Sequence, residues 1–392
     1  MRSKVAPNLF LHVLKRAPGL LPKMFRFLSR KKFGADRDLR RGDGTASKPP
    51  YMVSLRLTNA CNHRCPVCGQ YGVSGYMKEP ERKTPLSRTL PVETYKKMMD
   101  DLAFYQPYYY ATGGEPFLYP GLVELMNYAK ASGSCVFVVT NGTKLGQHAE
   151  ELVRNEWDML VVSFDGPEEI HDACRRTDGA YKAAIQGIRE VQDWKARLKK
   201  AKPLLVTVTT LSSENIEFLD ETYEIGRTLN PDLMAVFLSW FTSEQLGKAH
   251  GELLRNTLGV EAFTWKAYAR EFETAQAQLR ADNLSKVEKK KWPFNHIVVP
   301  SLSGTDVRDY YLKPSEMFGY DKCVAPFLEV NVMPNGDVVT CRDYIDVPVG
   351  NIAEKKLLDI WNGEGFVQFR RLLINEGGLL PQCSRCCGLM GF

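Results

Sequence analysis

The sequence predicts an α/β protein built on a partial (β/α)6 TIM-like barrel, followed by a C-terminal subdomain with a Cys-rich hairpin and helices. Strand-like and helix-like segments alternate six times within residues 51–240. Such alternation implies a parallel sheet with right-handed crossover connections. From residue 321 onward, a hairpin pattern and short helical segments carry five of the ten Cys residues.

The barrel elements follow from the spacing of apolar residues. Runs of β-branched and aromatic residues predict strands, and apolar residues recurring every three or four positions predict helices. The expected strands are residues 51–57, 108–111, 135–140, 159–164, 204–210 and 233–240. The expected helices are residues 90–105, 122–131, 149–155, 181–198 and 216–229. Polar motifs follow several of these strands, and ligands bind beyond the carboxyl ends of such sheets, so we expect one active-site mouth there.

The chain outside the barrel divides into three parts. Residues 1–50 form a basic amphipathic segment and a linker, residues 241–320 a helical connection, and residues 321–392 the Cys-bearing subdomain. In that subdomain, alternating residues around the turn sequence Pro-Asn-Gly-Asp at 334–337 predict a hairpin. Residues 352–373 then have helical spacing, so we expect hairpin and helices to lie together as one Cys-bearing subdomain.

The N-terminal segment combines apolar and basic character. Residues 5–33 mix apolar side chains with Lys and Arg, and Pro18 and Pro22 are expected to break them into short helical pieces. Such a segment either contacts an anionic membrane surface or packs on the protein body with its basic edge in water. Residues 35–50 are charged and contain Gly and Pro, which predicts a linker.

The composition is that of a globular protein from a reducing compartment. The 392 residues include ten Cys in close groups and no visible signal peptide, which favours metal binding over disulfides. No apolar run reaches the length of a membrane span. The net charge of +6 is modest and much of it lies near the N-terminus, so we expect no nucleic-acid partner. The expected location is cytoplasmic, with membrane association through residues 5–33 as the alternative.

Three Cys residues follow the first expected strand within eight positions: Cys61, Cys65 and Cys68, called the Cys triplet below. Cys thiolates are the usual ligands of a four-iron cluster, and three ligands leave one iron open to a small molecule. An open iron points to chemistry at the metal rather than simple electron storage. The alternatives are a set of packed free thiols and a zinc site with His63 as fourth ligand. His63 lies between the first two Cys residues, where a short loop would struggle to aim four groups at one ion.

Four Cys residues of the tail form a second candidate metal site: Cys323, Cys341, Cys383 and Cys386. Two flank the expected hairpin and two form a Cys-x2-Cys pair, so together they can close all corners of an auxiliary 4Fe-4S cluster. Cys387 is the alternative ligand to Cys386. A zinc ion held by four thiolates is the alternative occupant.

The order of these motifs resembles the radical S-adenosylmethionine (radical SAM) superfamily over residues 51–240, and the tail resembles its SPASM/Twitch extension. The motifs are the Cys triplet after the first strand and the run Gly113-Gly114-Glu115-Pro116 after the second. The resemblance implies that the Cys triplet holds a 4Fe-4S cluster whose open iron chelates S-adenosylmethionine. One electron then cleaves the sulfonium, and the released 5′-deoxyadenosyl radical takes hydrogen from a substrate.

The resemblance also implies which residues bind S-adenosylmethionine. The run at residues 113–116 would meet its methionine amino group, with Glu115 supporting the loop. Asn141 and Ser163 match positions around the ribose and methionine, and Arg175 matches an Arg near the methionine carboxylate. Relatives often carry an aromatic residue just before the third Cys, near the adenine, where this chain has Val67.

Two further features follow from the Cys count. The tail has too few Cys residues for the two auxiliary clusters of the longer SPASM pattern, so we expect one, in the Twitch arrangement. Cys135 starts an apolar strand and is expected in the core, whereas Cys174 lies beside Arg175. Cys174 is either an inert buried thiol or a hydrogen-atom donor of the kind that gives epimerisation.

The predicted function is a radical SAM enzyme that performs dehydrogenation, epimerisation or radical bond formation, with a flavodoxin- or ferredoxin-type electron donor. A small metabolite, a sugar or nucleoside, or a lipid-linked molecule is the expected substrate, because the N-terminal region does not look like the leader-binding domain of peptide-modifying relatives. The alternatives are a peptide-modifying maturase and a non-catalytic iron–sulfur or zinc protein. The last explains the Cys groups but not the ordered motifs at the strand ends.

Overall fold

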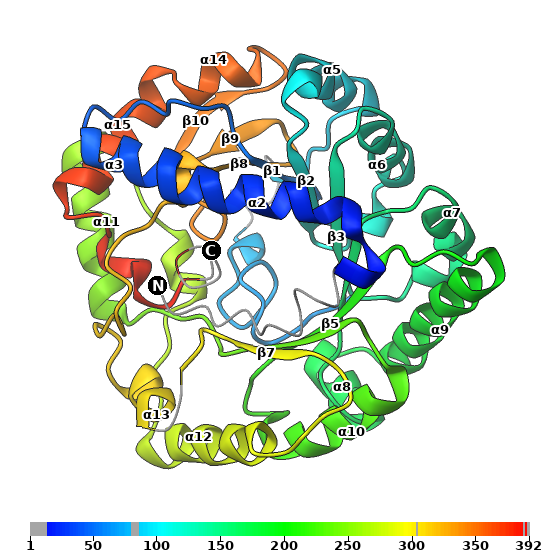
Figure 1. Cartoon of the computed structure of the whole chain (residues 1–392). Helices are drawn as coiled ribbons and strands as arrows, with labels where there is room; N and C mark the ends of the chain where they lie inside the picture. Colours follow the sequence, from blue (N-terminus) through cyan, green and yellow to red (C-terminus); the bar gives the residue numbers. More distant parts are fainter. Residues whose placement is uncertain (1–13, 80–85, 303–304, 387–388, 390–392) are drawn as a thin grey trace.

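One ten-stranded sheet forms the frame of the molecule (Figure 1). The computed structural model describes residues 14–79, 86–302, 305–386 and 389. The strands are β1 (Met52–Thr58), β2 (Tyr108–Gly113), β3 (Cys135–Thr140), β4 (Met159–Ser163), β5 (Leu204–Thr210), β6 (Leu233–Phe237), β7 (His296–Val299), β8 (Glu329–Val332), β9 (Asp337–Val339) and β10 (Pro348–Asn351). They lie side by side in the order β10-β9-β8-β1-β2-β3-β4-β5-β6-β7.

Strands β1 to β6 confirm the predicted partial barrel, because each pairs in parallel with the next. The helices between them cover the outer side of the sheet (Figure 1). These helices are α5 (Val92–Leu102), α6 (Leu122–Ala131), α7 (Ala149–Arg154), α8 (Glu168–Arg175), α9 (Ala180–Leu198) and α10 (Leu219–Leu229). Apolar side chains of β1 to β5 and their helices pack into one large core, and β6 and part of α10 contribute to a second, which together fix the positions of the strand ends.

Residues 241–320 contain a strand where the sequence predicted only a helical connection. β7 pairs in parallel with β6 and ends the sheet. Its four residues are all half-buried, so it lacks the alternation that identifies a strand in a sequence. The helical connection begins with α11 (Glu244–Leu258) and α12 (Thr274–Glu288), and Gly259, which adopts a φ of 67°, ends the first of them. Helix α13 (Thr305–Leu312) follows.

The C-terminal subdomain continues the barrel sheet instead of forming a separate layer. β8 pairs in parallel with β1, with Val330 opposite Val53. β9 pairs antiparallel with β8, which confirms the predicted hairpin, and β10 forms the edge. The helices here are α14 (Leu357–Trp361), α15 (Glu364–Asn375) and the short helix η10 (Pro381–Arg385). The Cys-bearing tail is therefore attached directly to the strand that leads into the Cys triplet.

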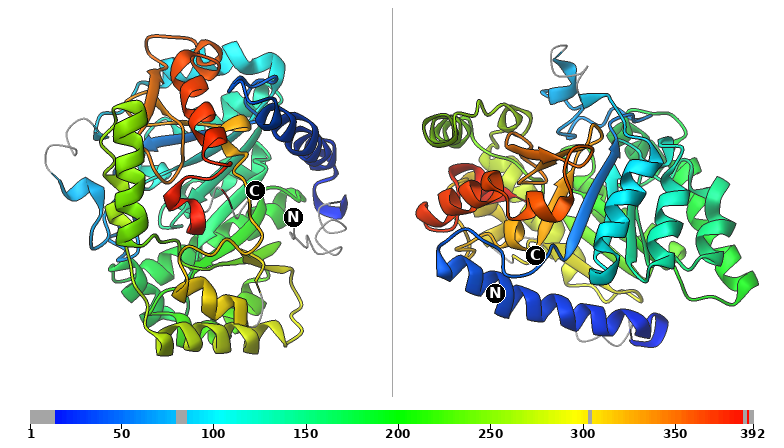
Figure 2. Two further views of the ribbon diagram at one scale, coloured as in Figure 1. Left: turned by 90° about the vertical axis from the view of Figure 1, so that its left-hand side faces the viewer. Right: turned by 90° about the horizontal axis from the view of Figure 1, so that it is seen from above.

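A continuous N-terminal helix crosses the end of the barrel where the strands begin (Figures 1 and 2). It comprises α2 (Leu21–Ser29), a π-helical stretch at Arg30–Ala35 and α3 (Asp36–Arg41). The predicted break at Pro22 is wrong, because Pro22 lies in the first turn, where its missing N–H is not needed. Residues 5–13 of the predicted segment lie outside the described residues. Across the described ranges, no helix combines the length and apolar character needed to cross a membrane.

The helix is held by aromatic packing against the first residues of the strands. The Phe27 and Tyr51 ring centroids lie 5.2 Å apart, and the Tyr51 and Tyr108 centroids 4.8 Å apart. The Tyr51 hydroxyl also donates to the Lys23 carbonyl at 2.6 Å. Cys135, at the start of β3, is buried in the same cluster, which confirms its expected place in the core.

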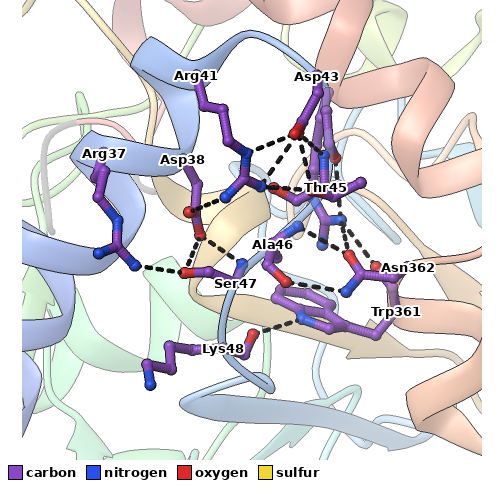
Figure 3. Close-up of polar contacts among 12 residues, drawn as sticks. Arg37, Asp38, Arg41, Asp43, Thr45, Ala46, Ser47, Lys48, Trp361 and Asn362 are labelled. Atoms are coloured by element: carbon purple, nitrogen blue, oxygen red, sulfur yellow. Dashed lines mark hydrogen bonds and ion pairs between the residues drawn. The ribbon is translucent and has the colours of Figure 1, made fainter.

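Residues 42–48 join this helix to the tail, where the sequence predicted a linker (Figure 3). The buried Asp38 carboxylate accepts a hydrogen bond from the Ser47 N–H at 2.7 Å. Asn362, between α14 and α15, accepts from the Ala46 N–H at 2.8 Å and donates to the Ala46 carbonyl at 2.9 Å. The segment is therefore anchored, because partners distant in the sequence satisfy its backbone groups. A sequence pattern cannot show such partners.

Asn362→Ala should destabilise the protein, because it leaves the N–H and carbonyl of Ala46 without partners. We expect the free energy of unfolding to fall by about 1–3 kcal/mol, measured by urea denaturation followed by circular dichroism. The matched control is Asn155→Ala, whose side chain donates only to the Glu151 carbonyl of its own surface helix. That variant should change the free energy by less than about 0.5 kcal/mol. Equal losses in the two variants would contradict the anchoring role.

Candidate functional site

The Cys triplet lies on a tight loop directly after β1. The Cys68 N–H donates to the Cys65 carbonyl at 3.1 Å, and the Gly72 N–H donates to the Cys68 carbonyl at 2.7 Å. The Arg64 N–H donates to the Arg175 carbonyl at 3.1 Å, which ties the loop to the end of α8. All three thiols are half-buried. The loop therefore holds them in a fixed position at the carboxyl end of the sheet.

Each sulfur of the Cys triplet has a hydrogen-bond donor. The donor–sulfur pairs are the His63 N–H with Cys61 Sγ at 3.4 Å, the Gln70 N–H with Cys68 Sγ at 3.4 Å, and the Arg175 guanidinium with Cys65 Sγ at 3.8 Å. Such donors stabilise the negative charge of a thiolate and tune the potential of a cluster that the thiolate holds. This donor set fits an iron–sulfur cluster.

Burial makes two of these thiols weak acids. It raises the pKa of Cys61 to about 11, and it raises the pKa of Cys65 as well. A thiol that binds a metal ion loses its proton, because the charge of the metal outweighs the cost of burying the thiolate. A metal cluster bound by this loop would therefore release protons.

A zinc site is the alternative to an iron–sulfur cluster at this loop. His63, the fourth ligand in that alternative, is buried, and its Nδ1 lies 2.8 Å from Thr177 Oγ1. Within the described part of the chain, no group of three or more His, Cys, Asp or Glu side chains is placed to hold a single metal ion. The ligands of a cluster bind different irons, so they stand farther apart than the ligands of one ion.

Gly113 and Gly114 allow the end of β2 to lie against the backbone that leads into the Cys triplet. The Gly114 N–H donates to the Thr58 carbonyl, and the Glu115 N–H to the Ala60 carbonyl, both at 2.8 Å. A Cβ on Gly114 would lie 2.0 Å from the Ala60 carbonyl oxygen, and Gly113 adopts a φ of 135°. Only glycine fits this junction. The amides of Gly114 and Glu115 are thus used within the junction itself.

Glu115 ties the end of β2 to the end of β3. Its buried carboxylate accepts hydrogen bonds from the Phe117 N–H at 3.1 Å, the Thr140 hydroxyl at 2.7 Å and the Asn141 N–H at 2.7 Å. Burial raises the pKa of this carboxyl, against the lowering effect of the three bonds. Pro116 follows and opens the short helix η5 (Pro116–Leu118). Glu115 therefore stabilises the loop from inside.

Asn141 joins the end of β3 to the Cys loop. Its Nδ2 donates to Asn62 Oδ1 at 2.8 Å, and its Oδ1 accepts from the Thr143 N–H at 3.0 Å. Ser163, the last residue of β4, lies farther along the same edge and lines the cavity beside Cys65. Both residues thus lie at the mouth, although Asn141 already has protein partners.

A cavity lies beside Cys65, at the carboxyl ends of β4 and β5. Its lining includes Ser163, Asp165, Cys174, Arg175, Thr210 and Glu214. Arg175 Nη2 and Asp165 Oδ2 form an ion pair at 2.5 Å. Although burial opposes it, the pKa of Arg175 is raised by Asp165 and Cys65. Among the described residues, Arg175 Nε is buried with no hydrogen-bond partner.

Cys174 borders the same cavity as Cys65. Its Sγ lies 3.9 Å from Ser212 Oγ, and burial raises its pKa to about 12.

Thr210, Ser212 and Glu214 also line this cavity, and they were not among the predicted site residues. The signal was available, because these polar residues follow β5 as the other polar motifs follow their strands.

The tail thiols of Cys323, Cys341, Cys383 and Cys386 line one further cavity. Burial raises the pKa of Cys383 to about 12, and Cys386 Sγ lies 3.3 Å from Asp343 Oδ2. Four thiols around one cavity match the ligand number of a complete four-iron cluster. Cys387, the alternative ligand, lies outside the described residues.

Aromatic side chains lie between the two Cys groups. Tyr268 lies so close to Gly69, directly after Cys68, that a Cβ on Gly69 would be 2.2 Å from the Tyr268 hydroxyl oxygen. The Tyr268 and Tyr344 ring centroids are 5.5 Å apart, and Tyr344 lines the cavity of the tail thiols. Two packed rings therefore connect the two Cys groups.

Two sequence-family models match the regions that hold these sites. The model of the Radical SAM superfamily matches residues 55–224, which run from β1 to α10. The model of SPASM, an iron–sulfur cluster-binding domain, matches residues 323–387. The second match begins at the first tail Cys and includes the other four.

Two enzymes are similar to this chain in sequence. An AdoMet-dependent heme synthase from Methanosarcina barkeri is 30% identical over 191 residues, which cover 48% of this chain and 50% of that protein. A PqqA peptide cyclase from Xanthomonas euvesicatoria is 28% identical over 338 residues, which cover 82% of this chain and 77% of that protein.

A solved structure shares the fold. Streptococcus suis SuiB, bound to its precursor peptide SuiA, aligns with a TM-score of 0.59 at 14% sequence identity. The alignment covers 91% of this chain and 79% of SuiB. At this identity the likeness concerns the fold alone.

Gly114→Ala should disrupt the Cys loop, because the added methyl group would press on the Ala60 carbonyl. We expect the iron bound per chain after anaerobic reconstitution to fall by half or more, and the thermal unfolding midpoint to fall as well. Gly19→Ala is the matched control, since a Cβ there meets nothing within 4 Å. It should keep both values. Normal iron content in Gly114→Ala would contradict the role assigned to this junction.

Proposed function

Because this chain belongs to the radical SAM superfamily and carries an iron–sulfur cluster-binding domain of the SPASM type, we propose that Cys61, Cys65 and Cys68 hold its S-adenosylmethionine-binding 4Fe-4S cluster. When bound, this cluster supplies the electron that cleaves S-adenosylmethionine, and the resulting 5′-deoxyadenosyl radical takes a hydrogen atom from the substrate. The observation that carries the assignment is the set of three hydrogen-bond donors, one on each sulfur of the triplet. A flavodoxin- or ferredoxin-type protein is the proposed source of the electron.

The cavity beside Cys65 is the proposed site of S-adenosylmethionine. It adjoins one proposed cluster ligand, and Arg175, whose buried Nε has no hydrogen-bond partner among the described residues, is one of its lining residues. Arg175 would receive the methionine carboxylate, and Ser163 would contact the polar groups of the ligand. Asp165 keeps the Arg175 guanidinium charged and oriented through their ion pair. Gly113, Gly114, Glu115 and Asn141 position the loop, as their internal hydrogen bonds indicate.

The proposed role of the tail is to hold one auxiliary 4Fe-4S cluster on Cys323, Cys341, Cys383 and Cys386. These thiols line one cavity, and four ligands leave no iron open. A cluster without an open iron suits electron transfer better than substrate binding. The ring pair Tyr268 and Tyr344 separates it from the Cys triplet by packed protein rather than by water.

A peptide is the proposed substrate, which departs from our initial expectation of a small metabolite, sugar, nucleoside or lipid-linked molecule. Support comes from the PqqA peptide cyclase, whose similarity covers 82% of this chain. The SuiB structure bound to its precursor peptide shares the fold over 91% of this chain. The proposed reaction is hydrogen abstraction from a peptide residue, with the auxiliary cluster accepting the remaining electron.

A tetrapyrrole is the second candidate substrate. The observation in its favour is the 30% identity to the AdoMet-dependent heme synthase, which covers about half of each chain. The two substrates differ in a simple property, because proteases destroy only the peptide.

Anaerobic reconstitution should load about eight irons per chain, from two four-iron clusters. Cys65→Ala and Cys341→Ala should each lose about four of them. Cys65→Ala should also stop 5′-deoxyadenosine formation with dithionite and S-adenosylmethionine, because it removes a ligand of the reactive cluster. Cys135→Ala, which changes a buried thiol of the core, should retain both clusters and the activity. If Cys65→Ala makes 5′-deoxyadenosine at the wild-type rate, the assignment of the Cys triplet is wrong.

The substrate class can be tested with extracts of the native host, by measuring which fractions increase the rate of 5′-deoxyadenosine formation. We expect the stimulating fraction to lose its effect after proteinase K treatment and removal of the protease. Mass spectrometry of the peptides should then reveal a loss of hydrogen or a new bond. Stimulation that survives the protease would contradict the peptide substrate and favour the tetrapyrrole.

A further inference from the structure

An apolar surface covers the end of the barrel where the strands begin. Six large apolar side chains are exposed among the described residues, and four lie on the N-terminal segment: Leu14, Phe25, Leu28 and Phe33. A fifth, Phe104, is 91% exposed and precedes Tyr105, whose carbonyl accepts a hydrogen bond from Arg26 of α2. Five of the six thus gather at one end of the molecule, and their surface is called the docking face below.

Basic side chains lie among these apolar ones. Lys32, Arg37 and Arg40 are exposed on the same continuous helix. Lys15 and Arg16, which precede the helix, are exposed as well. The exposed positive charge therefore extends along the whole described N-terminal segment.

The acidic side chains of the helix do not neutralise the docking face. Asp38 is buried and pairs with Arg41 at 3.1 Å, and Asp36 pairs with Lys322 of the tail at 3.2 Å. Two copies of this surface would bring like charges together, which costs free energy. The charge pattern thus disfavours a second copy of the chain as the partner.

We propose that the docking face binds the surface of an anionic lipid bilayer. The exposed apolar side chains would enter the boundary between headgroups and acyl chains, while the basic side chains pair with lipid phosphates. The helix of residues 21–41 is about 30 Å long, so it can lie in the plane of the membrane with contacts along its length. Its opposite side is held by the aromatic packing on Tyr51 and by the anchor at Asn362.

Docking in this way points the active-site mouth away from the bilayer. The helix packs on Tyr51 and Tyr108, which lie where β1 and β2 begin, whereas the Cys triplet follows the other end of β1. A substrate therefore reaches the mouth from the aqueous side. Membrane attachment through this face does not require a substrate embedded in lipid, so the inference is independent of the proposed substrate.

Vesicle flotation of the full chain with its clusters tests the proposal. The probes are vesicles of equal parts phosphatidylcholine and phosphatidylglycerol, compared with vesicles of phosphatidylcholine alone. We expect flotation with the anionic vesicles at low salt, and weaker flotation with neutral vesicles or at high salt. Lys32→Glu with Arg40→Glu should weaken the partition roughly fivefold or more for each positive charge removed. Leu28→Glu with Phe33→Glu should weaken it by at least a factor of about ten.

Matched controls alter the same kinds of side chain elsewhere. Val73→Glu changes an exposed apolar residue near the Cys loop, and Lys289→Glu with Lys291→Glu changes the basic run after α12. Both should float like the wild type, and circular dichroism should confirm that all variants are folded. The proposal is overturned if the wild type ignores anionic vesicles, or if the controls lose as much as the docking-face variants. A dimer in solution that Phe33→Glu dissociates, without vesicle binding, would assign the face to self-association instead.

Discussion

Both Cys groups depend on the position of β1 inside the sheet. β1 pairs in parallel with β2 of the barrel on one side and with β8 of the tail on the other, so it joins the two parts into one sheet. Its carboxyl end leads into the Cys triplet, and β8 leads through the hairpin to Cys341. Backbone pairing therefore sets the distance between a three-thiol site and a four-thiol site, and a slip of this register would displace both.

The close contact at the end of β2 makes that arrangement rigid. The carbonyls of Thr58 and Ala60 accept hydrogen bonds from the N–H groups of Gly114 and Glu115. The Glu115 carboxylate in turn accepts a hydrogen bond from the Asn141 N–H at the start of the loop after β3. The loops after three neighbouring strands thus support one another through buried hydrogen bonds, which are costly to leave unmade. A radical enzyme needs such support, since a small displacement of the reacting atoms lowers the rate strongly.

Local patterns in the sequence were sufficient for the parts of the fold that depend on local chemistry. Six strands, the five predicted helices and the hairpin around Gly336 follow from apolar periodicity and turn residues. Helix α8 was not predicted, and three further features did not follow because each depends on contacts between distant residues. β7 is too short and too evenly half-buried to show a period, the parallel pairing of β8 with β1 joins residues far apart in sequence, and the segment after Arg41 is fixed by Asn362. At the site, the proposed Cys ligands stand out by their spacing, whereas the unpartnered Arg175 Nε depends on the packing of α8.

The central claim is that S-adenosylmethionine binds directly to a cluster on the Cys triplet while the tail holds a separate one. Electron paramagnetic resonance of the dithionite-reduced protein tests it, because a ligand on an open iron changes the spectrum of that cluster alone. The account predicts two overlapping signals, of which one shifts on adding S-adenosylmethionine, and it predicts that Cys65→Ala loses the shifting signal and keeps the other. A reduced spectrum that S-adenosylmethionine leaves unchanged in the wild type would contradict the account.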